Sequence, residues 1–440
     1  MASPSVSTPS SITQRCPHRP RTDMLRRVML LVTTACLLAG GCSSGGTDHA
    51  TIQVDHTTAP ADQAVHLTVG GLESHAKVSV SAQANDRAGK TWRAEATFTA
   101  DDHGAIDLDS SSPAGGSYQG VDGMGLFWSM NPPDGDPDQQ AYAPPVQGDR
   151  LIEQVEIQVH RDDKTLARTT LTRQWATSGV TSRKLTPATD KVSGVYRAPP
   201  PDHTKHPAVL LFGGSEGGNA VESIAELLAS HGYPALSVAY FHAPGLPQEL
   251  RDIPVEYFAT AARWLARQPG VDPAHVIALS ASRGTEAALL LSDHFPDLVH
   301  GAVLYAPTDV VVGSFPAVGG AAWTLVGEQL PPDSSIPVDQ VSGPVLAIAG
   351  SDDALWASMG AAPRIAFALD DAHNRYPHRA LVFPQAGHGI AGPPYLPHGT
   401  KEVHPVSHEA ITLGGTRAGN EAALRQGWAA VLALLASLTH

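Results

Sequence analysis

One stretch decides the fold of this chain, Val276-Ile277-Ala278-Leu279-Ser280-Ala281-Ser282-Arg283-Gly284-Thr285-Glu286. Four apolar residues run into a corner of small residues, and a helix-forming run, 286–291, follows at once. A strand, a tight turn and a helix in this order make a nucleophile elbow, which presents a serine hydroxyl above the edge of a sheet. Gly284 meets the need for small residues around the corner, while Ser280 stands where glycine is commoner. We therefore predict that Ser282 is a nucleophile; an ordinary strand-to-helix loop is the alternative.

Apolar segments on both sides of this corner alternate with helix-forming segments. Strands are expected at 208–212, 235–240, 302–305, 345–350 and 380–383, and helices at 220–231, 255–267 and 420–438. Strands that alternate with helices indicate a parallel sheet with crossovers, and continuous apolar strands indicate a sheet that is covered on both faces. We predict a mostly parallel α/β domain over residues 207–440.

Three loops at the expected carboxyl ends of these strands carry side chains of one chemistry. The elbow carries Ser282. The loop after the strand at 345–350 carries Asp352 and Asp353, and the loop after the strand at 380–383 carries His388. Ligands bind at these strand ends, and the order Ser, Asp, His is that of α/β-hydrolases. A neutral serine needs a base to take its proton and an acid to orient that base. We predict a triad of Ser282, His388 and Asp353, preferring Asp353 to Asp352 because such enzymes usually place the acid three residues after a glycine like Gly350. The alternatives are a histidine in an ordinary glycine turn and aspartates that cap a solvated loop.

The glycine-rich loop at 213–218 is expected to complete this site. It lacks the Gly-Lys-Ser/Thr ending of a phosphate-binding P-loop and the spacing of a dinucleotide fingerprint. We interpret it as one side of an oxyanion hole, with a backbone N–H of Gly214 or Ser215 as donor and the N–H of Arg283 as the second donor. The Arg283 side chain has two alternatives, an anionic group of the substrate or a surface carboxylate. This chemistry needs no cofactor and no metal, and none is predicted.

Residues 51–180 show a different pattern, with short runs of alternating apolar and polar residues. These runs occur at 65–69, 77–82, 92–98, 151–159 and 165–172, separated by Gly, Asp and Asn turns. Such a pattern is typical of an antiparallel β-sandwich with one buried face and one wet face. Residues 181–206 are expected to be a linker with one short embedded strand.

A Gly/aromatic/Met patch at 115–130 interrupts the alternating runs. One interpretation is a long loop whose aromatic side chains plug the sandwich or the boundary between the domains. The other is a lid or wall for an acyl-binding cavity in the α/β domain. The Pro/Asp-rich segment 132–145 that follows is expected to be an exposed loop.

The first 42 residues have the pattern of a targeting segment. Basic residues precede the apolar run 28–38, which ends in Ala39-Gly40-Gly41-Cys42. This predicts a signal peptide with a lipobox-like end, in which Cys42 is lipidated and residues 43–50 form a tether. A plain signal peptidase site nearby is the alternative. The expected location is outside a bacterial cell membrane, held at its outer face by the lipid on Cys42.

The charge and the cysteine content restrict which metals, nucleic acids and lipids the protein is expected to bind. All three cysteines, Cys16, Cys36 and Cys42, lie in the targeting segment, so the mature domains would have no disulfide and no thiolate metal site. Removing residues 1–41 takes away five arginines and one aspartate, which leaves 24 basic and 42 acidic residues and a net charge of −18. Such a surface argues against nucleic acid and against electrostatic docking to anionic lipid. The sequence leaves the oligomeric state open.

Several segments beyond residue 50 carry a resemblance to a known family. They are Gly116-Ser117-Tyr118, Met124-Gly125-Leu126-Phe127-Trp128, Ser280-Ala281-Ser282-Arg283-Gly284, Gly350-Ser351-Asp352-Asp353 with Trp356, Gly387-His388-Gly389-Ile390 with Pro393-Pro394-Tyr395, and Leu413-Gly414-Gly415. With these segments the chain resembles the acyl-CoA thioesterase / bile acid-CoA:amino acid N-acyltransferase family. The resemblance implies an immunoglobulin-like N-terminal domain followed by an α/β-hydrolase domain. It also implies hydrolysis of acyl-CoA thioesters, or transfer of the acyl group to an amino acid amine.

The function expected from the residues and the resemblance together is that of a serine hydrolase that cleaves acyl thioesters through an acyl-enzyme. The transferase branch of the family has a cysteine nucleophile, so Ser282 favours water as the acceptor. Export suggests an alternative, a carboxylesterase acting on acyl esters without coenzyme A, because acyl-CoA is a cytosolic metabolite. Two further alternatives are an acyltransferase to an amine or alcohol and a non-catalytic surface binding protein.

Overall fold

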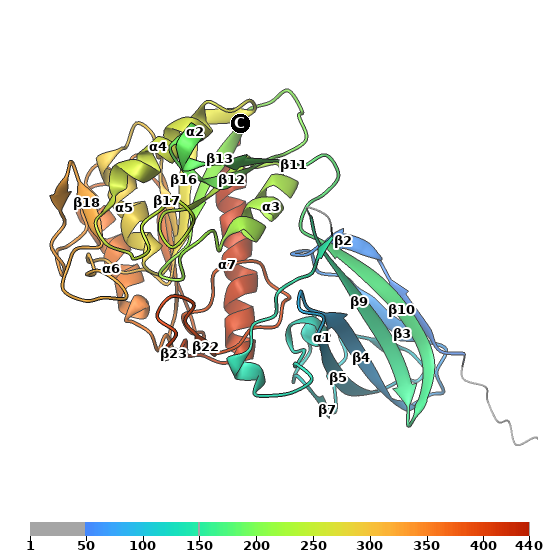
Figure 1. Cartoon of the computed structure of the whole chain (residues 1–440). Helices are drawn as coiled ribbons and strands as arrows, with labels where there is room; N and C mark the ends of the chain where they lie inside the picture. The colour runs from blue at the N-terminus through green and yellow to red at the C-terminus, as the bar shows by residue number, and fades with distance from the viewer. Residues whose placement is uncertain (1–48, 148–149, 440) are drawn as a thin grey trace, which may run out of the picture. The chain divides into compact units, whose positions relative to one another are not determined.

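The computed structural model describes residues 49–147 and 150–439, and the chain from Thr47 onward forms one compact unit (Figure 1). The predicted signal peptide, Cys42 and nearly all of the tether lie outside the described residues. Within the described ranges, no helix combines the length and the apolar character needed to cross a membrane.

The first part of this unit consists of two β-sheets. A three-stranded sheet has the order β1-β3-β6, and a seven-stranded sheet has the order β2-β10-β9-β4-β5-β7 with β8 beside β9. Its elements are β1 (Thr51–Val54), β2 (Thr58–Pro60), β3 (Leu67–Gly70), β4 (Lys77–Asn85), β5 (Thr91–Thr99), β6 (Ile106–Asp107), β7 (Gly115–Gly116), α1 (Gly125–Trp128), the 3₁₀ helix η1 (Pro137–Gln139), β8 (Val146–Gln147), β9 (Arg150–Arg161) and β10 (Lys164–Gln174). All pairings are antiparallel except that of β2 with β10. Side chains of β5 alternate between the core and solvent, which is the expected period of two. The immunoglobulin-like assignment stays a prediction.

The second part is built on an eight-stranded sheet with the order β11-β12-β14-β13-β16-β17-β20-β21. These strands are β11 (Thr181–Leu185), β12 (Ser193–Ala198), β13 (His206–Phe212), β14 (Ala235–Ala239), β16 (Val271–Ala281), β17 (Ala302–Tyr305), β20 (Val345–Gly350) and β21 (His378–Phe383). Only β12 runs antiparallel to its neighbours β11 and β14, and the remaining pairs are parallel. The predicted mostly parallel sheet is therefore confirmed.

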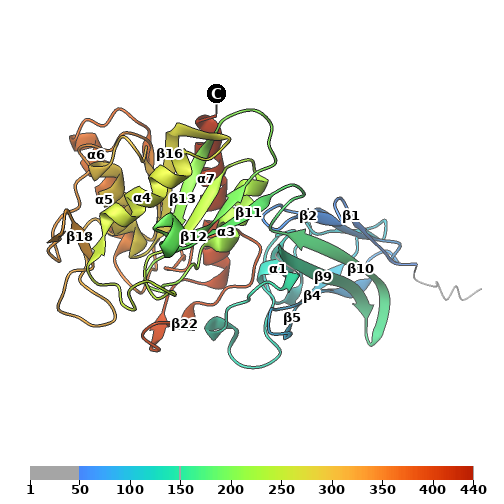
Figure 2. The same cartoon turned by 45° about the horizontal axis from the view of Figure 1, so that its top comes forward.

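Helices cover both faces of this sheet, as the continuous apolar strands predict (Figures 1 and 2). α3 (Glu222–Ser230) and α7 (Arg417–Ser437) pack with the side chains that β13 presents on one face, Val209 and Leu211. α4 (Val255–Ala266), α5 (Gly284–His294) and α6 (Ser358–Asp371) pack on the other face, with Leu210 and Phe212. The smaller elements are α2 (Pro187–Asp190), a sheet of β15 (Ile253–Pro254), β18 (Trp323–Leu325) and β19 (Glu328–Gln329), and a hairpin of β22 (Lys401–Val403) and β23 (Ala410–Thr412).

The one strand expected within the linker 181–206 is present as β12, but the segment also carries β11, and both strands belong to the large sheet. β11 is an edge strand with four of its five residues exposed, so it has no apolar pattern to reveal it. β12 is held partly by charge, since Arg197 forms ion pairs with Glu222 at 2.8 Å and Glu226 at 3.2 Å on α3.

The Gly/aromatic/Met patch at 115–130 packs inside the first part. Tyr118, Leu126 and Phe127 are buried in its core. The patch also contacts the second part, because Asp122 accepts a hydrogen bond from Arg425 on α7 at 3.1 Å. The structure therefore favours the interpretation in which the aromatic side chains fill the core of the first part over the interpretation in which the patch covers an acyl-binding cavity.

Candidate active site

Ser282 lies at the corner between β16 and α5, in the left-handed backbone region with φ of +52°. Non-glycine residues adopt this region rarely and at a cost, and nucleophile elbows are such places. The corner is held by the Ser282 N–H, which donates to the Tyr305 carbonyl at 2.9 Å, and by Thr285, whose N–H and hydroxyl donate to the Ser282 carbonyl at 2.9 and 2.6 Å. A Cβ at Gly284 would lie 2.2 Å from the Gly213 carbonyl oxygen, so only glycine fits there. The predicted strand, tight corner and helix are all present.

Ser280 is accommodated where glycine is commoner because its hydroxyl is satisfied. It is fully buried and donates to the Phe212 carbonyl at 2.7 Å. The bond links β16 to β13 directly beneath the corner.

His388 and Asp353 come together from the loops after β21 and β20. The Nδ1 atom of His388 lies 2.9 Å from Oδ2 and 3.2 Å from Oδ1 of Asp353. Asp353 also accepts hydrogen bonds from the Ser358 hydroxyl at 2.5 Å and the Trp356 N–H at 3.2 Å. Burial alone would raise the pKa of Asp353, but the hydrogen bond and charge of His388, with these further bonds, outweigh it and lower the pKa. Asp352 instead accepts a bond from the Ser351 hydroxyl at 2.8 Å, so Asp353 is the carboxylate that orients the ring.

Ser282 and His388 line the same cavity, which has a volume of about 320 Å³ and is called the Ser282 cavity below. The Nε2 atom of His388 is buried, and within residues 49–147 and 150–439 it has no hydrogen-bond partner. Buried polar atoms are nearly always paired, so an unpaired imidazole nitrogen beside a serine is typical of a functional site. The structure thus brings the two side chains to one cavity without a hydrogen bond between them.

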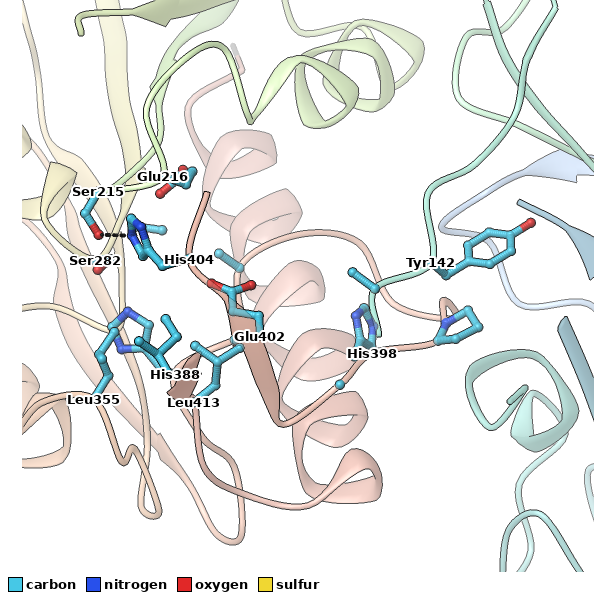
Figure 3. A pocket seen from close by; sticks show the side chains of 17 residues that line it. Tyr142, Ser215, Glu216, Ser282, Leu355, His388, His398, Glu402, His404 and Leu413 are labelled. Atoms are coloured by element: carbon cyan, nitrogen blue, oxygen red, sulfur yellow. Dashed lines mark hydrogen bonds between the residues drawn. The ribbon is translucent and has the colours of Figure 1, made fainter. Parts of the chain in front are cut away.

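Part of the wall of the Ser282 cavity comes from segments for which the sequence predicted no role in the site. Glu402 and His404 belong to the β22–β23 hairpin and its loop, and Tyr142 comes from the 132–145 segment (Figure 3). This segment was expected to be exposed, but Tyr142 is buried and its hydroxyl donates to the Asn85 carbonyl at 3.0 Å. Hairpins without an apolar run leave no sequence signal, which is why these residues were missed.

The charged residues that line the Ser282 cavity are acidic, and no lysine or arginine is among its described lining residues. Burial, with the nearby carboxylate of Glu402, raises the pKa of Glu216. Burial likewise raises the pKa of Glu402, and the charge of His388 opposes this shift. The carboxylates of Glu216 and Glu402 therefore disfavour a further negative charge, such as a substrate carboxylate, in this cavity.

The glycine-rich loop after β13 lies close to Ser282. A Cβ at Gly214 would lie 2.8 Å from the Cβ of Ser282. The N–H of Gly214, however, already donates to both carboxylate oxygens of Glu216 at 2.9 Å. Of the two predicted donor positions in this loop, Gly214 is thus engaged. The Ser215 hydroxyl lies 3.0 Å from Nε2 of His404.

The Arg283 side chain follows neither expected alternative. It is buried and pairs with the buried Glu286 at 2.5 Å, and it donates to the carbonyls of Val312 at 2.9 Å and Gly313 at 2.7 Å. Glu286 in turn accepts bonds from the Val312 N–H at 2.7 Å and from the Trp323 indole at 2.8 Å. The pair ties the loop after β17 to the elbow, and only the backbone N–H of Arg283 stays a candidate for the oxyanion hole.

Comparisons with known proteins agree on one family. The sequence model of the acyl-CoA thioester hydrolase/BAAT N-terminal region matches residues 62–187, and that of the BAAT / acyl-CoA thioester hydrolase C terminal matches residues 320–439. A peroxisomal succinyl-coenzyme A thioesterase of Mus musculus is 28% identical over 418 residues, covering 87% of this chain and 95% of its own length. Acyl-coenzyme A thioesterase 6 of Mus musculus is 29% identical over 390 residues, covering 83% and 91%.

A solved structure to which part of the chain is similar is a dienelactone hydrolase-like promiscuous phosphotriesterase from metagenomic libraries. It is 18% identical with a TM-score of 0.41, and the match covers 60% of this chain and 100% of that one. The two family matches flank the elbow, and both relatives align with more than four-fifths of the chain. The chain belongs to the acyl-CoA thioester hydrolase/BAAT family.

Proposed function

We propose that this protein hydrolyses acyl thioesters of the acyl-CoA type through an acyl-enzyme on Ser282. The family membership supports thioester hydrolysis. One observation carries the assignment of residues: Asp353 holds His388 by Nδ1, which leaves Nε2 unpaired in the cavity that Ser282 lines.

The proposed reaction has two halves. The Ser282 hydroxyl oxygen attacks the thioester carbonyl carbon while its proton passes to Nε2 of His388. The tetrahedral intermediate then expels the thiolate, which takes that proton as the C–S bond breaks. Water attacks the acyl-enzyme, gives a proton to His388, and the C–O bond to Ser282 breaks with that proton returning to the serine. Asp353 keeps the ring in place and stabilises the imidazolium in both halves.

The negative oxygen of each intermediate needs hydrogen-bond donors. The backbone N–H of Arg283 directly follows the nucleophile at the start of α5, where the helix dipole also favours negative charge. The second donor comes from the 213–215 loop, which abuts Ser282. Because the Gly214 N–H already donates to Glu216, we assign the second hydrogen-bond donor of the oxyanion hole to Ser215.

The test is a panel of acyl-CoA thioesters and p-nitrophenyl esters, assayed with Ser282→Ala and with Ser334→Ala as the control. Ser334 is a hydroxyl outside the cavity that donates to the Pro331 carbonyl at 2.6 Å. We expect kcat to fall by about 10⁴-fold or more in Ser282→Ala and to stay unchanged in the control. Intact-protein mass spectrometry should trap the acyl group on Ser282. Full activity of Ser282→Ala on every hydrolysed substrate would refute the triad.

The same panel separates the alternatives. Hydrolysis of esters with no activity on any acyl-CoA would favour the carboxylesterase, an alternative that gains weight because no cation among the described lining residues is available to bind a coenzyme A phosphate. Product formation with amine or alcohol acceptors that outruns hydrolysis would indicate an acyltransferase. No labelling of the folded protein by a fluorophosphonate probe would favour a binding protein.

We further propose that the protein is exported and anchored by a lipid on Cys42. The proposal rests on the apolar run and the Ala39-Gly40-Gly41-Cys42 sequence. Membrane fractions of bacteria that express the full chain should hold the wild type and lose Cys42→Ala to the soluble exported fraction. Equal membrane retention of both would contradict the lipid anchor.

A further inference from the structure

His404 is a second buried histidine in the wall of the Ser282 cavity, and the triad does not use it. It follows β22 and is 5% exposed. Its Nδ1 atom accepts hydrogen bonds from the N–H groups of Val406 at 3.2 Å and Ser407 at 3.3 Å. A backbone N–H can only donate, so Nδ1 presents a lone pair. A neutral imidazole with a lone pair on Nδ1 carries its hydrogen on Nε2.

This tautomer decides the direction of the bond to Ser215. The Nε2–H of His404 donates to the Ser215 hydroxyl oxygen at 3.0 Å. The hydroxyl therefore acts as an acceptor toward His404 and keeps its own hydrogen for another partner. Within the part of the chain that the structure describes, no further hydrogen bond of this hydroxyl is found.

The Ser282 cavity offers a place for the partner of that hydrogen, because Ser215 lines it. Ser215 and Ser282 both line it, and Gly214, the neighbour of Ser215, abuts the Ser282 side chain. Figure 3 shows the Ser215 hydroxyl and the His404 ring beside Ser282, on the side of the cavity opposite His398. A carbonyl oxygen of a substrate whose carbon meets Ser282 would lie within this group of residues.

We propose that the Ser215 hydroxyl, held as a donor by His404, is a catalytic hydrogen-bond donor of the oxyanion hole. The inference rests on the proposed function and deepens it, because it replaces a backbone donor with a side chain. Serine hydroxyls serve as such donors, and their value is greatest where the negative charge develops in a site that excludes water.

The chemistry of this step needs no net proton transfer. As the Ser282 oxygen bonds to the carbonyl carbon, the π electrons move onto the carbonyl oxygen, and the Ser215 O–H bond points at the new negative charge. The proton stays on Ser215, and the electron pair returns to the carbonyl when the leaving group departs. His404 is a positioning residue. Burial lowers the pKa of His404, which keeps its ring neutral and its tautomer unchanged during turnover.

The experiment compares Ser215→Ala, Ser215→Thr and the Ser334→Ala control in two assays. The first is steady-state kinetics on the best acyl thioester, and the second is the rate at which a fluorophosphonate labels Ser282, with the labelled residue mapped by peptide mass. We expect Ser215→Ala to lower kcat by about 10²- to 10³-fold with little change in KM, and to slow labelling in parallel, because the phosphonyl oxygen occupies the same hole. Ser215→Thr keeps a hydroxyl and should retain most of the rate.

The outcomes separate the two proposals. Labelling on Ser282 at the same rate in wild type and Ser215→Ala, with unchanged kcat, overturns the hydroxyl donor and leaves the triad standing. Wild-type labelling at a residue other than Ser282 overturns the proposed function, and a label on Ser215 itself would make it the nucleophile. A raised KM and a lower melting temperature without loss of kcat would show that the Ser215–His404 bond only holds the hairpin. If Ser215→Ala does not fold, Ser215→Gly takes its place.

Discussion

His388 and His404 are both buried in the wall of the Ser282 cavity, and each has a serine as a neighbour. What faces their Nδ1 atoms differs. At His388 it is the carboxylate of Asp353, an acceptor, so Nδ1 carries the hydrogen and Nε2 has a lone pair. At His404 it is a pair of backbone N–H groups, so the lone pair is on Nδ1 and Nε2 is a donor. The group on the far nitrogen thus decides whether a histidine is a base or a hydrogen-bond donor.

The same contacts decide how each ring responds to a proton. A carboxylate stabilises an imidazolium, whereas two N–H donors aimed at Nδ1 oppose it, as does the burial that lowers the pKa of His404. Of the two histidines, His388 is thus the one whose surroundings suit the general base of the proposed mechanism.

The largest effect on kcat is expected when Asp353, the group that faces Nδ1 of His388, is changed. In Asp353→Asn the new amide can donate to Nδ1, which would give His388 the tautomer of His404 and remove its lone pair from Nε2. We expect kcat to fall by about 10⁴-fold. Asp352→Asn is the matched control, because the neighbouring carboxylate pairs with Ser351 and not with the ring. Equal losses in the two variants would contradict the assignment of Asp353.

A smaller effect is expected at His404, because the Ser215 hydroxyl would remain after its support is removed. His404→Phe should lower kcat by about tenfold, the value of one orienting hydrogen bond. His404→Gln, whose amide can donate to the hydroxyl, should recover part of that loss. A double variant of His404→Phe with Ser215→Ala should be no slower than Ser215→Ala alone, since both changes act through one hydroxyl. Additive losses would show that His404 acts by another route.

A third test concerns Glu402, an acidic residue that lines the Ser282 cavity together with both histidines. Burial raises the pKa of its carboxyl group. We expect Glu402→Gln to raise kcat/KM at pH 8 several-fold for acyl groups that carry a carboxylate, such as succinyl, and to leave neutral acyl groups unchanged. Val403→Ala on the exposed side of the hairpin is the control. The same gain for neutral substrates would show that charge is not the cause.

The smallest expected effect is on stability as a function of pH. The pKa of His404 is lowered in the folded protein, so the folded state binds fewer protons than the unfolded state below pH 6.5. The stability that the neutral His404 ring contributes is thus fully present above pH 6.5 and is lost as the pH falls below that value, through the lowered pKa of the folded state. We expect the melting temperature of His404→Gln to decline less over this range than that of the wild type. Nitrogen-15 shifts of histidine should show the Nε2–H tautomer in the resonance that His404→Gln removes.

The two histidines also show how far sequence reasoning reached. His388 could be predicted because it follows a recognisable strand in a Gly-His-Gly turn and completes the order Ser, Asp, His. His404 is one of 21 histidines and lies in a hairpin with no apolar pattern. The order of residues in the sequence does not show which loops fold back over the cavity. Such long-range contacts leave no local pattern in the sequence.

The same contrast applies to the fold. The apolar strands of the large sheet were expected, because burial on both faces requires continuous apolar runs. The one short strand expected within the linker is present as β12, whereas β11 has no sequence signal, because the edge of a sheet needs no apolar run. Tyr142 was assigned to an exposed loop, since the Pro/Asp-rich composition around it does not reveal that the tip of the segment turns inward.

By itself the sequence determined the parallel sheet, the strained corner at Ser282 and the carboxylate and imidazole candidates at two strand ends, because periodicity and turn chemistry are local properties. Only the tertiary structure decided that Asp353 rather than Asp352 meets His388, that Glu216 occupies the Gly214 N–H, and that Arg283 is held by a buried carboxylate. The physical reason is that hydrogen bonds depend on distance and direction in space, and residues remote in the chain supply both.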